Sequence, residues 1–172
     1  RRGHSLTYRA LDIMGLFGRT GGVPPKDRPP HRQEYRLPDM RRRAALAGLP
    51  LNLKPAHWPT NGALSGYAII AAQAAGGGDL GKLVHSFGAA CWAQERDIAE
   101  DAVVRDCLEG AGFDPALADS GLLTGAETFV ANLEEAVRRG VFGAPFFITD
   151  QDERLWGQDR LDDLDAVLAG KV

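Results

Sequence analysis

Cysteine is scarce in this chain, which contains only Cys91 and Cys107. The two do not form a Cys-x-x-Cys pair, and their surroundings lack metal-ligand spacing, so neither a dithiol redox pair nor a metal site is built on them. Both fall in segments with helical patterns, where we expect them to pack in a core. Two scattered cysteines suit a reducing compartment, and we therefore expect a cytoplasmic protein.

The chain also lacks an excess of positive charge, because its formal net charge is −3. This argues against nucleic-acid binding, which depends on a basic surface. The charge is uneven: residues 1–54 contain twelve Lys and Arg against four Asp and Glu, and the rest contains eight against nineteen. The basic part is either a rim that attracts an anionic substrate or a set of solvated helix faces, as expected for Arg41, Arg42 and Arg43.

A long hydrophobic run is absent as well, so no segment is expected to span a membrane. No signal peptide is visible, and because the first residue is Arg1 rather than Met, we expect the natural N-terminus to lie upstream. Hydrophobic residues nevertheless make up 44 % of the 172 positions. That is enough to bury the core of one domain, with or without an insertion.

The predicted elements follow a characteristic order. Alternating residues predict a strand over 5–13, and Gly- and Pro-rich sequence predicts a long loop over 15–30. Prolines keep residues 49–58 extended. The helical period predicts helices at residues 31–47, 63–75, 80–95, 100–110 and 124–139. Two strands, 144–149 and 154–156, and an amphipathic helix that begins near Gln158 complete the chain.

This order is that of an α/β, thioredoxin-like fold with an all-helical insertion. The strand and helix that should open such a fold are not among the predicted elements, and we expect them upstream of Arg1. We assign the whole chain to one domain. Residues 1–60 and 140–172 form its thioredoxin part, and residues 61–139 form the mainly helical insertion.

A proline stands at the start of a predicted buried strand in Val141-Phe142-Gly143-Ala144-Pro145-Phe146. Proline there removes a donor from the strand ladder. A cis Ala144–Pro145 bond would explain it, because the backbone of Ala144 could then pair with a peptide-like ligand as an added strand. An ordinary trans proline that opens a strand is the alternative.

A second motif, Leu155-Trp156-Gly157-Gln158-Asp159-Arg160-Leu161, passes from a strand into a helix. Gly157 allows a tight turn, and the N–H groups at the helix start favour a bound carboxylate. Asp159 offers an acceptor for an ammonium group, so the motif suits a free amino-acid terminus. The alternative is that Asp159 only caps the helix.

Together the two motifs resemble the C-terminal signature of the 2-hydroxychromene-2-carboxylate isomerases. These enzymes are related to the kappa-class glutathione transferases in the DsbA-like branch of the thioredoxin superfamily. The resemblance covers the whole chain. It includes Trp92-Ala93-Gln94-Glu95-Arg96-Asp97-Ile98, Gly21-Gly22-Val23-Pro24-Pro25 and Trp58-Pro59-Thr60-Asn61.

The resemblance implies that glutathione is the cofactor. Ala144 would pair with its cysteinyl backbone beside cis Pro145, and Gln158 and Asp159 would hold its γ-glutamyl end. Gly22 stands where relatives often have an Asn that contacts glutathione, and it offers only backbone. The Ser that activates the sulfur in this family is expected upstream of the chain, so the catalytic residue is unknown.

The resemblance also implies a substrate pocket that contains Trp58, Asn61 and Tyr67. Tyr67 departs from the Arg that many members carry at this position. Trp156 is a further candidate wall of the pocket, with core packing as its alternative. His31 and His57 are candidate acid–base groups, with surface histidines as the alternative. Lys54 is a candidate contact for an anion.

The implied reaction is a glutathione-dependent isomerisation between 2-hydroxychromene-2-carboxylate and trans-o-hydroxybenzylidenepyruvate, in the breakdown of aromatic compounds. We expect a homodimer that acts on a small aromatic carboxylate, without a metal, nucleic acid or membrane. One alternative is a kappa-like glutathione transferase or peroxidase. Others are a DsbA-like disulfide oxidoreductase, whose Cys-x-x-Cys would lie upstream, and a relative that only binds.

Overall fold

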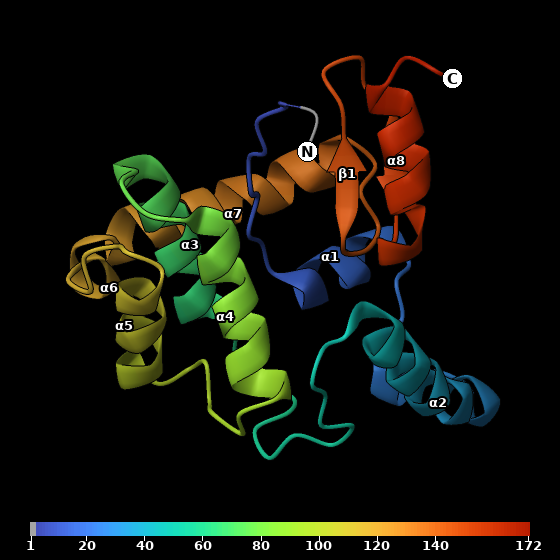
Figure 1. The fold of residues 1–172 in the computed structure, drawn as a ribbon, viewed down its shortest axis with the longest axis horizontal. Coiled ribbons are helices and arrows are strands. Elements are labelled where there is room, and N and C mark those ends of the chain that lie inside the picture. Colours follow the sequence, from blue (N-terminus) through green and yellow to red (C-terminus); the bar gives the residue numbers. More distant parts are fainter. Residues whose placement is uncertain (1–2) are drawn as a thin grey trace.

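The computed structural model describes residues 3–172 as a mainly helical molecule with one small sheet (Figure 1). The bounds of its elements are α1 Ile13–Thr20, η1 Pro25–Asp27, α2 Pro30–Ala47, α3 Ala63–Ala75, α4 Leu80–Trp92, α5 Asp101–Gly110, α6 Leu117–Ser120, α7 Leu122–Arg138, β1 Phe146–Ile148, β2 Arg154–Trp156, η2 Gln158–Arg160 and α8 Leu161–Leu168. Of the helices in this described part, none has the length and apolarity that a membrane span requires.

The larger hydrophobic core lies among α3, α4, α5 and the segment that follows α5. Leu83 and Leu108 are fully buried there, and Phe113 fills the space beside Gly78. Small residues let α3 and α7 approach closely. A Cβ atom on Gly125 of α7 would lie 2.8 Å from Cβ of Tyr67 on α3, so a larger residue would force the helices apart.

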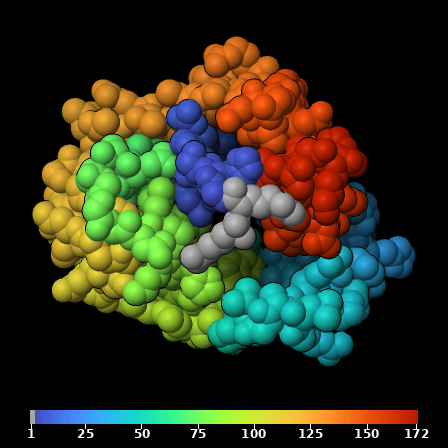
Figure 2. Space-filling view, turned by 45° about the horizontal axis from the view of Figure 1, so that its top comes forward, coloured from blue at the N-terminus to red at the C-terminus, as the bar shows by residue number. Residues whose placement is uncertain are grey.

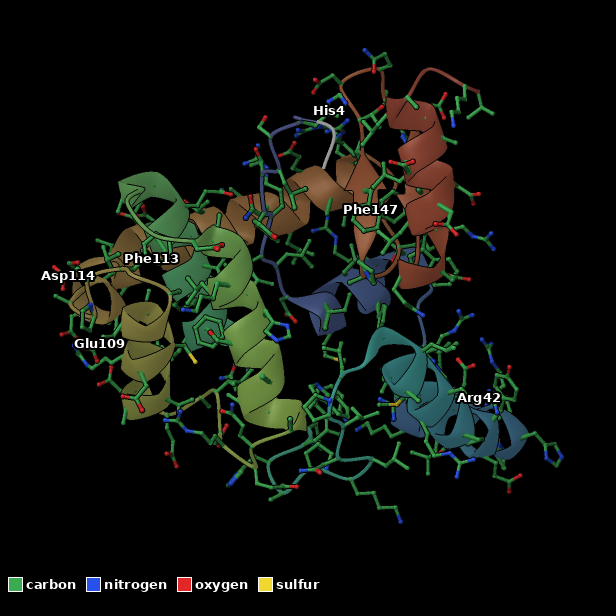
Figure 3. All side chains as sticks on the ribbon, viewed as in Figure 1. His4, Arg42, Glu109, Phe113, Asp114 and Phe147 are labelled. Carbon is green, nitrogen blue, oxygen red and sulfur yellow. The ribbon has the colours of Figure 1, made fainter. Side chains whose placement is uncertain are left out.

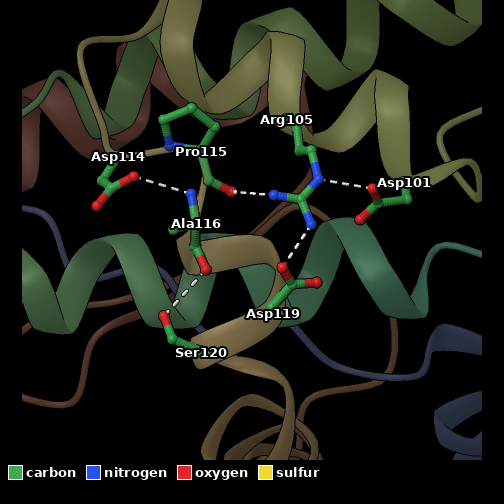
Figure 4. Close-up of polar contacts among 7 residues, drawn as sticks. All are labelled: Asp101, Arg105, Asp114, Pro115, Ala116, Asp119 and Ser120. Atoms are coloured by element: carbon green, nitrogen blue, oxygen red, sulfur yellow. Dashed lines mark hydrogen bonds and ion pairs between the residues drawn. The ribbon is translucent and has the colours of Figure 1, made fainter.

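Arg105 ties α5 to the short helix α6 (Figure 4). Its guanidinium donates to Asp101 and Asp119, each at 2.6 Å, and to the carbonyl of Pro115 at 3.3 Å. The hydrogen bonds that Arg105 donates to the two carboxylates, and then their negative charge, raise the pKa of Arg105 above its usual value. A four-residue helix is not stable by itself, so α6 depends on this connection and on packing against α3.

A smaller core lies between α1, α7 and β1. Leu16, Ala136 and Val141 are buried in it, and Phe146 and Ile148 of β1 pack against them. β1 and β2 pair antiparallel, with Phe146 opposite Trp156 and Ile148 opposite Arg154. α7 thus packs on α3 of the larger core and contributes Ala136 to the smaller core, which supports the sheet.

The predicted strand over residues 5–13 is wrong. The segment is extended, but residues 4–12 join no strand ladder. Its backbone pairs with side chains instead: the amide of Gln73 accepts from the N–H of Tyr8 at 2.7 Å and donates to its carbonyl at 3.1 Å. Asn132 donates to the carbonyl of Ala10 at 2.8 Å. Figure 2 shows this blue segment between the green helices and the red C-terminal part.

The predicted long loop over 15–30 is also wrong in its first part, where α1 forms. Asp12 caps this helix by accepting from the N–H of Met14 at 2.9 Å, and Gly21 ends it with a positive φ. Gly15 and Gly18 make this segment look like a loop in the sequence, because glycine is unfavourable inside a helix. A Cβ atom on Gly15 would lie 3.1 Å from Leu133, so glycine allows α1 to pack closely on α7.

Most other elements agree with their predictions. α3 and β2 have the predicted bounds, and α2 accommodates Pro38 within its 18 residues. α4 ends at Trp92, earlier than predicted. The last helix differs at its start, because Gln158–Arg160 form a 3-10 turn and α8 begins at Leu161.

Candidate functional site

The two C-terminal motifs meet in one hydrogen-bonded unit. The N–H of Gly157 donates to the carbonyl of Pro145 at 3.0 Å. This bond joins the start of β1 to the turn after β2. The Ala144–Pro145 peptide bond is cis, which confirms the expectation from the sequence. Ala144 and Pro145 are exposed, so the main chain at this junction is open to a ligand.

The turn after β2 requires glycine. Gly157 has φ of +111°, a conformation that side chains rarely adopt, and a Cβ atom on it would lie 2.4 Å from Oδ1 of Asp159. Asp159 therefore folds back over the turn. Its Oδ2 lies 3.8 Å from Arg160, and it caps neither η2 nor α8, so the alternative in which Asp159 only caps the helix is wrong. Gln158 and Asp159 are both exposed.

Three aromatic rings flank the junction. Phe142 lies edge-on to Phe146 at 5.3 Å between ring centroids and to Trp156 at 5.0 Å. Trp156 is 53 % exposed, so its ring lies at the surface rather than in a core. Gly143 lies directly beneath it, since a Cβ atom there would be 2.5 Å from the indole Nε1. The sequence prediction did not include Phe142 and Gly143, although both stand inside the first motif.

Gly22 lies just after α1, and its surroundings explain why it is glycine. A Cβ atom on Gly22 would lie 2.1 Å from the ring of Phe17. An Asn at this position would therefore displace that ring. Across residues 3–172, no hydrogen bond or ring contact joins Gly22 to Ala144 or to the Gly157 turn.

The predicted substrate-pocket residues lie on different elements from this junction. Trp58 is 40 % exposed and packs on Trp92 at 4.7 Å between ring centroids. Asn61 accepts from the N–H of Ala63 at 3.0 Å in the turn just before α3, whose N-cap is Gly62. Tyr67 packs edge-on against Phe129 at 5.3 Å in the contact between α3 and α7.

These three residues are not brought to the Ala144–Gly157 junction by contacts within the described part of the chain. The loop that carries Trp58 lies at the lower edge of Figure 1, whereas β1 lies at the upper right. Tyr67 is half-buried between helices, so its ring is engaged in packing. The sequence could not reveal this separation, because each residue was placed by its motif alone.

Glu95 and Asp97, in the segment that follows α4, hold the loop with Trp58. Glu95 has a positive φ of 55°; it accepts from Asn52 at 2.5 Å and from the N–H of Ala56. Asp97 Oδ1 accepts from the hydroxyl of Thr60 at 2.5 Å. The sequence prediction noted this segment only as part of the family resemblance, and the structure shows that its carboxylates position the loop.

Asp97 is also the acidic neighbour of His57. Its Oδ1 accepts from the N–H of Ala99 at 3.0 Å, and its Oδ2 lies 3.8 Å from Nδ1 of His57. The hydrogen bond from Thr60, then the one from Ala99, and finally the attraction of His57 lower the pKa of Asp97. Asp97 is therefore a stable anion beside the half-exposed imidazole of His57. His57 lies on the loop that contains the other cis peptide bond, Trp58–Pro59, and not at the Ala144–Gly157 junction.

Both cysteines are buried and free, which confirms that they pack in the interior. Burial, followed by the charges of Asp97 and Glu95, raises the pKa of Cys91. A thiol with a raised pKa forms little thiolate at neutral pH, so Cys91 is a poor nucleophile.

Comparison with known proteins agrees with this architecture. A family model described as the DSBA-like thioredoxin domain matches residues 1–169. The chain therefore belongs to the DsbA-like thioredoxin family, and the α/β thioredoxin-like fold with a helical insertion is confirmed.

Among solved structures, the chain is similar to a selenomethionine-labelled 2-hydroxychromene-2-carboxylate isomerase. The two are 25 % identical and superpose with a TM-score of 0.76, over 95 % of this chain and 79 % of the isomerase. This agrees with the resemblance seen in the sequence. No curated protein matches the chain.

Proposed function

We propose that this protein is a glutathione-dependent isomerase that acts on a small aromatic carboxylate of the 2-hydroxychromene-2-carboxylate type. The observation that carries the proposal is the hydrogen bond from the N–H of Gly157 to the carbonyl of Pro145. It holds the exposed main chain of Ala144 beside the turn that contains Gln158 and Asp159. The similar solved structure, named as an isomerase of this type, supports the reaction class.

The residues at the junction fit a tripeptide with a free amino-acid end. The exposed backbone of Ala144 offers an N–H donor and a carbonyl acceptor for a peptide segment. The carboxylate of Asp159 offers an acceptor for an ammonium group, and the backbone N–H groups at the start of η2 suit a carboxylate. Glutathione, when bound, would supply a thiol nucleophile to the conjugated double bond of the substrate.

In this proposal the aromatic rings beside the junction contact the substrate rather than glutathione. Phe142 and Trp156 present apolar surface next to Ala144, against which the ring of an aromatic carboxylate can lie. Their edge-on contact limits the rotation of both rings, so the wall has a defined shape. Holding both molecules in register makes the reaction effectively intramolecular, which is the main contribution that binding groups make to such a step.

The test is the rate of isomerisation with and without glutathione. We expect the rate to increase and then saturate with glutathione, because the thiol is required in each turnover. S-methylglutathione is the matched control, since it retains the backbone and the γ-glutamyl end but has no free thiol; it should inhibit rather than support the reaction. Equal rates with and without glutathione would contradict the proposal.

A further inference from the structure

A cavity lies beside α2, away from the junction described above. Its volume is about 320 Å³, and it is lined by Arg28, His31, Arg32, Tyr35, Arg36 and Asp39. This volume is at the lower end of the range for small-molecule sites, roughly 300–1,000 Å³. In Figure 3, Arg42 marks α2 at the lower right, well separated from Phe147 on β1.

The lining of this cavity has an excess of positive charge. It contains three guanidinium groups but a single carboxylate, that of Asp39, and Asp39 already contacts Arg42 at 3.3 Å. The Nε of Arg28 donates to the carbonyl of Val23 at 2.9 Å, and its two terminal nitrogens are left to donate to a ligand. The guanidinium of Arg32 has no hydrogen bond or ion pair with any residue in the described part of the chain, and its backbone N–H donates to the carbonyl of Pro29.

The arginines of this cavity repel one another when no anion is bound between them. Arg32 and Arg36 are four residues apart on one helix, and like charges at this spacing repel. Burial, and then the charge of Arg28, lower the pKa of Arg36, and both arginines line the same cavity. The first turn of α2 adds to the positive field, because it contains neither an acidic residue nor a capping side chain.

Packing accounts for the position of Arg36 but not for that of Arg32. α2 has no buried residue, and Arg32 is exposed. Arg36 lies over the ring of Trp92 at 5.8 Å, and this contact fixes its direction at one end of the cavity. Successive turns of a helix rise about 5.4 Å, so Arg32 and Arg36 present donors at a spacing that suits two anionic groups in one ligand.

We propose that this cavity binds a small anion that carries at least two negative charges, held by Arg28, Arg32 and Arg36. Phosphate and carboxylate groups share the required chemistry, because both accept paired hydrogen bonds from a guanidinium. The site does not depend on the proposed isomerase activity, since it shares no residue with the Ala144–Gly157 junction.

The test is calorimetric titration of the full chain with pyrophosphate and, separately, with citrate, in the absence of glutathione. We expect saturable binding at one site by at least one of them, with a Kd of about 1 mM or tighter. Selective binding of pyrophosphate would identify phosphate groups as the ligand chemistry, and selective binding of citrate would identify carboxylates. Absence of saturable binding by both would overturn the proposal.

Single-residue variants distinguish binding in this cavity from a general attraction of anions to the basic helix. Arg32→Gln and Arg36→Gln should each weaken binding about tenfold, because each removes a charge-assisted contact. Arg41→Gln and Arg43→Gln remove the same charge from exposed positions on the same helix, outside the cavity, and should change binding less than about twofold. Equal losses in both pairs would overturn the site. Far-UV circular dichroism checks that each variant keeps α2.

Discussion

At the scale of single residues, glycine determines the shape of the candidate site. Gly143 lets Trp156 lie flat over the backbone next to Ala144, and Gly157 supplies the positive φ that the turn after β2 requires. Gly22 makes room for Phe17. The exposure of Ala144 agrees with the sequence prediction, but the contacts of Gly143 with Trp156 and of Gly22 with Phe17 depend on how the chain folds. Motif spacing alone could not identify these contacts.

Gly143→Ala should therefore destabilise the protein. The new Cβ atom would lie 2.5 Å from Nε1 of Trp156, so the indole must move or the backbone must shift. We expect a loss of about 1–3 kcal/mol in the free energy of unfolding, measured by urea denaturation. Near-ultraviolet circular dichroism should show that the environment of tryptophan changes.

Gly18→Ala is the matched control, because the added methyl group on α1 meets nothing within 4 Å. It should leave stability unchanged or raise it slightly, since alanine favours helix. Equal stability of the Gly143→Ala variant and the unmodified protein would contradict the close packing of Trp156 on the backbone.

At the scale of elements, side chains take the place of a neighbouring strand. Alternation over residues 5–13 predicts a strand, but the backbone of Tyr8 pairs with Gln73 and that of Ala10 with Asn132. The alternation of residues predicts an extended segment, but it does not identify the groups that will hydrogen-bond to the backbone of that segment. The partner here is two helices, so only the tertiary arrangement decides between a strand and an extended coil.

Gln73→Ala should release the backbone of Tyr8. It removes both hydrogen bonds to this residue, at 2.7 and 3.1 Å, while the helix propensity of position 73 improves. We expect the amide of Tyr8 to exchange its hydrogen faster, as measured by hydrogen–deuterium exchange. Gln94→Ala, at an exposed position after α4, is the control and should not change that amide. Unchanged protection of Tyr8 in Gln73→Ala would contradict the pairing.

Asp97 gives the loop around Trp58 a dependence on pH. Because hydrogen bonds from Thr60 and Ala99, and the charge of His57, lower its pKa, folding favours its charged form. Its stabilising contribution is complete above the ordinary pKa of aspartate, about 4, and is lost as pH falls through the lowered value. Acid should therefore loosen the loop, which tryptophan fluorescence can report through the contact of Trp58 with Trp92.

Asp97→Asn should make this fluorescence change smaller, because the titrating group is gone and the loop is already less tightly held at neutral pH. Asp162→Asn removes an equal charge from the exposed start of α8 and serves as the control. The same acid transition in Asp97→Asn and in the unmodified protein would show that another group controls the loop.

At the scale of the whole molecule, the described residues form two hydrophobic cores that are built from different elements. The larger core contains Leu108 and the smaller one contains Leu16, both fully buried. The periodic helices of the larger core were predicted from the sequence, because their own residues form it. The smaller core joins α1, α7 and β1 across the chain, and the helix α1 in it was missed.

Truncating a buried leucine should affect different elements, depending on which of the two cores contains it. Leu108→Ala and Leu16→Ala should each lower the free energy of unfolding by about 2–5 kcal/mol, as is usual for a buried leucine. In native-state hydrogen exchange, Leu16→Ala should release α1 and the β1–β2 sheet and leave α4 and α5 protected. Leu108→Ala should reduce protection in α4 and α5. Identical exchange patterns for both variants would mean that the molecule has one cooperative unit.

Binding of glutathione at the Ala144–Gly157 junction is tested most directly by titrating the isotope-labelled chain with glutathione and following the amide NMR shifts. Reduced glutathione should shift Phe146, Gly157, Gln158 and Asp159 in a saturable way. Asp159→Asn should weaken binding about tenfold, and Asp163→Asn in α8 less than about twofold. Shifts absent from this junction at about 10 mM glutathione, or confined to other elements, would contradict the account.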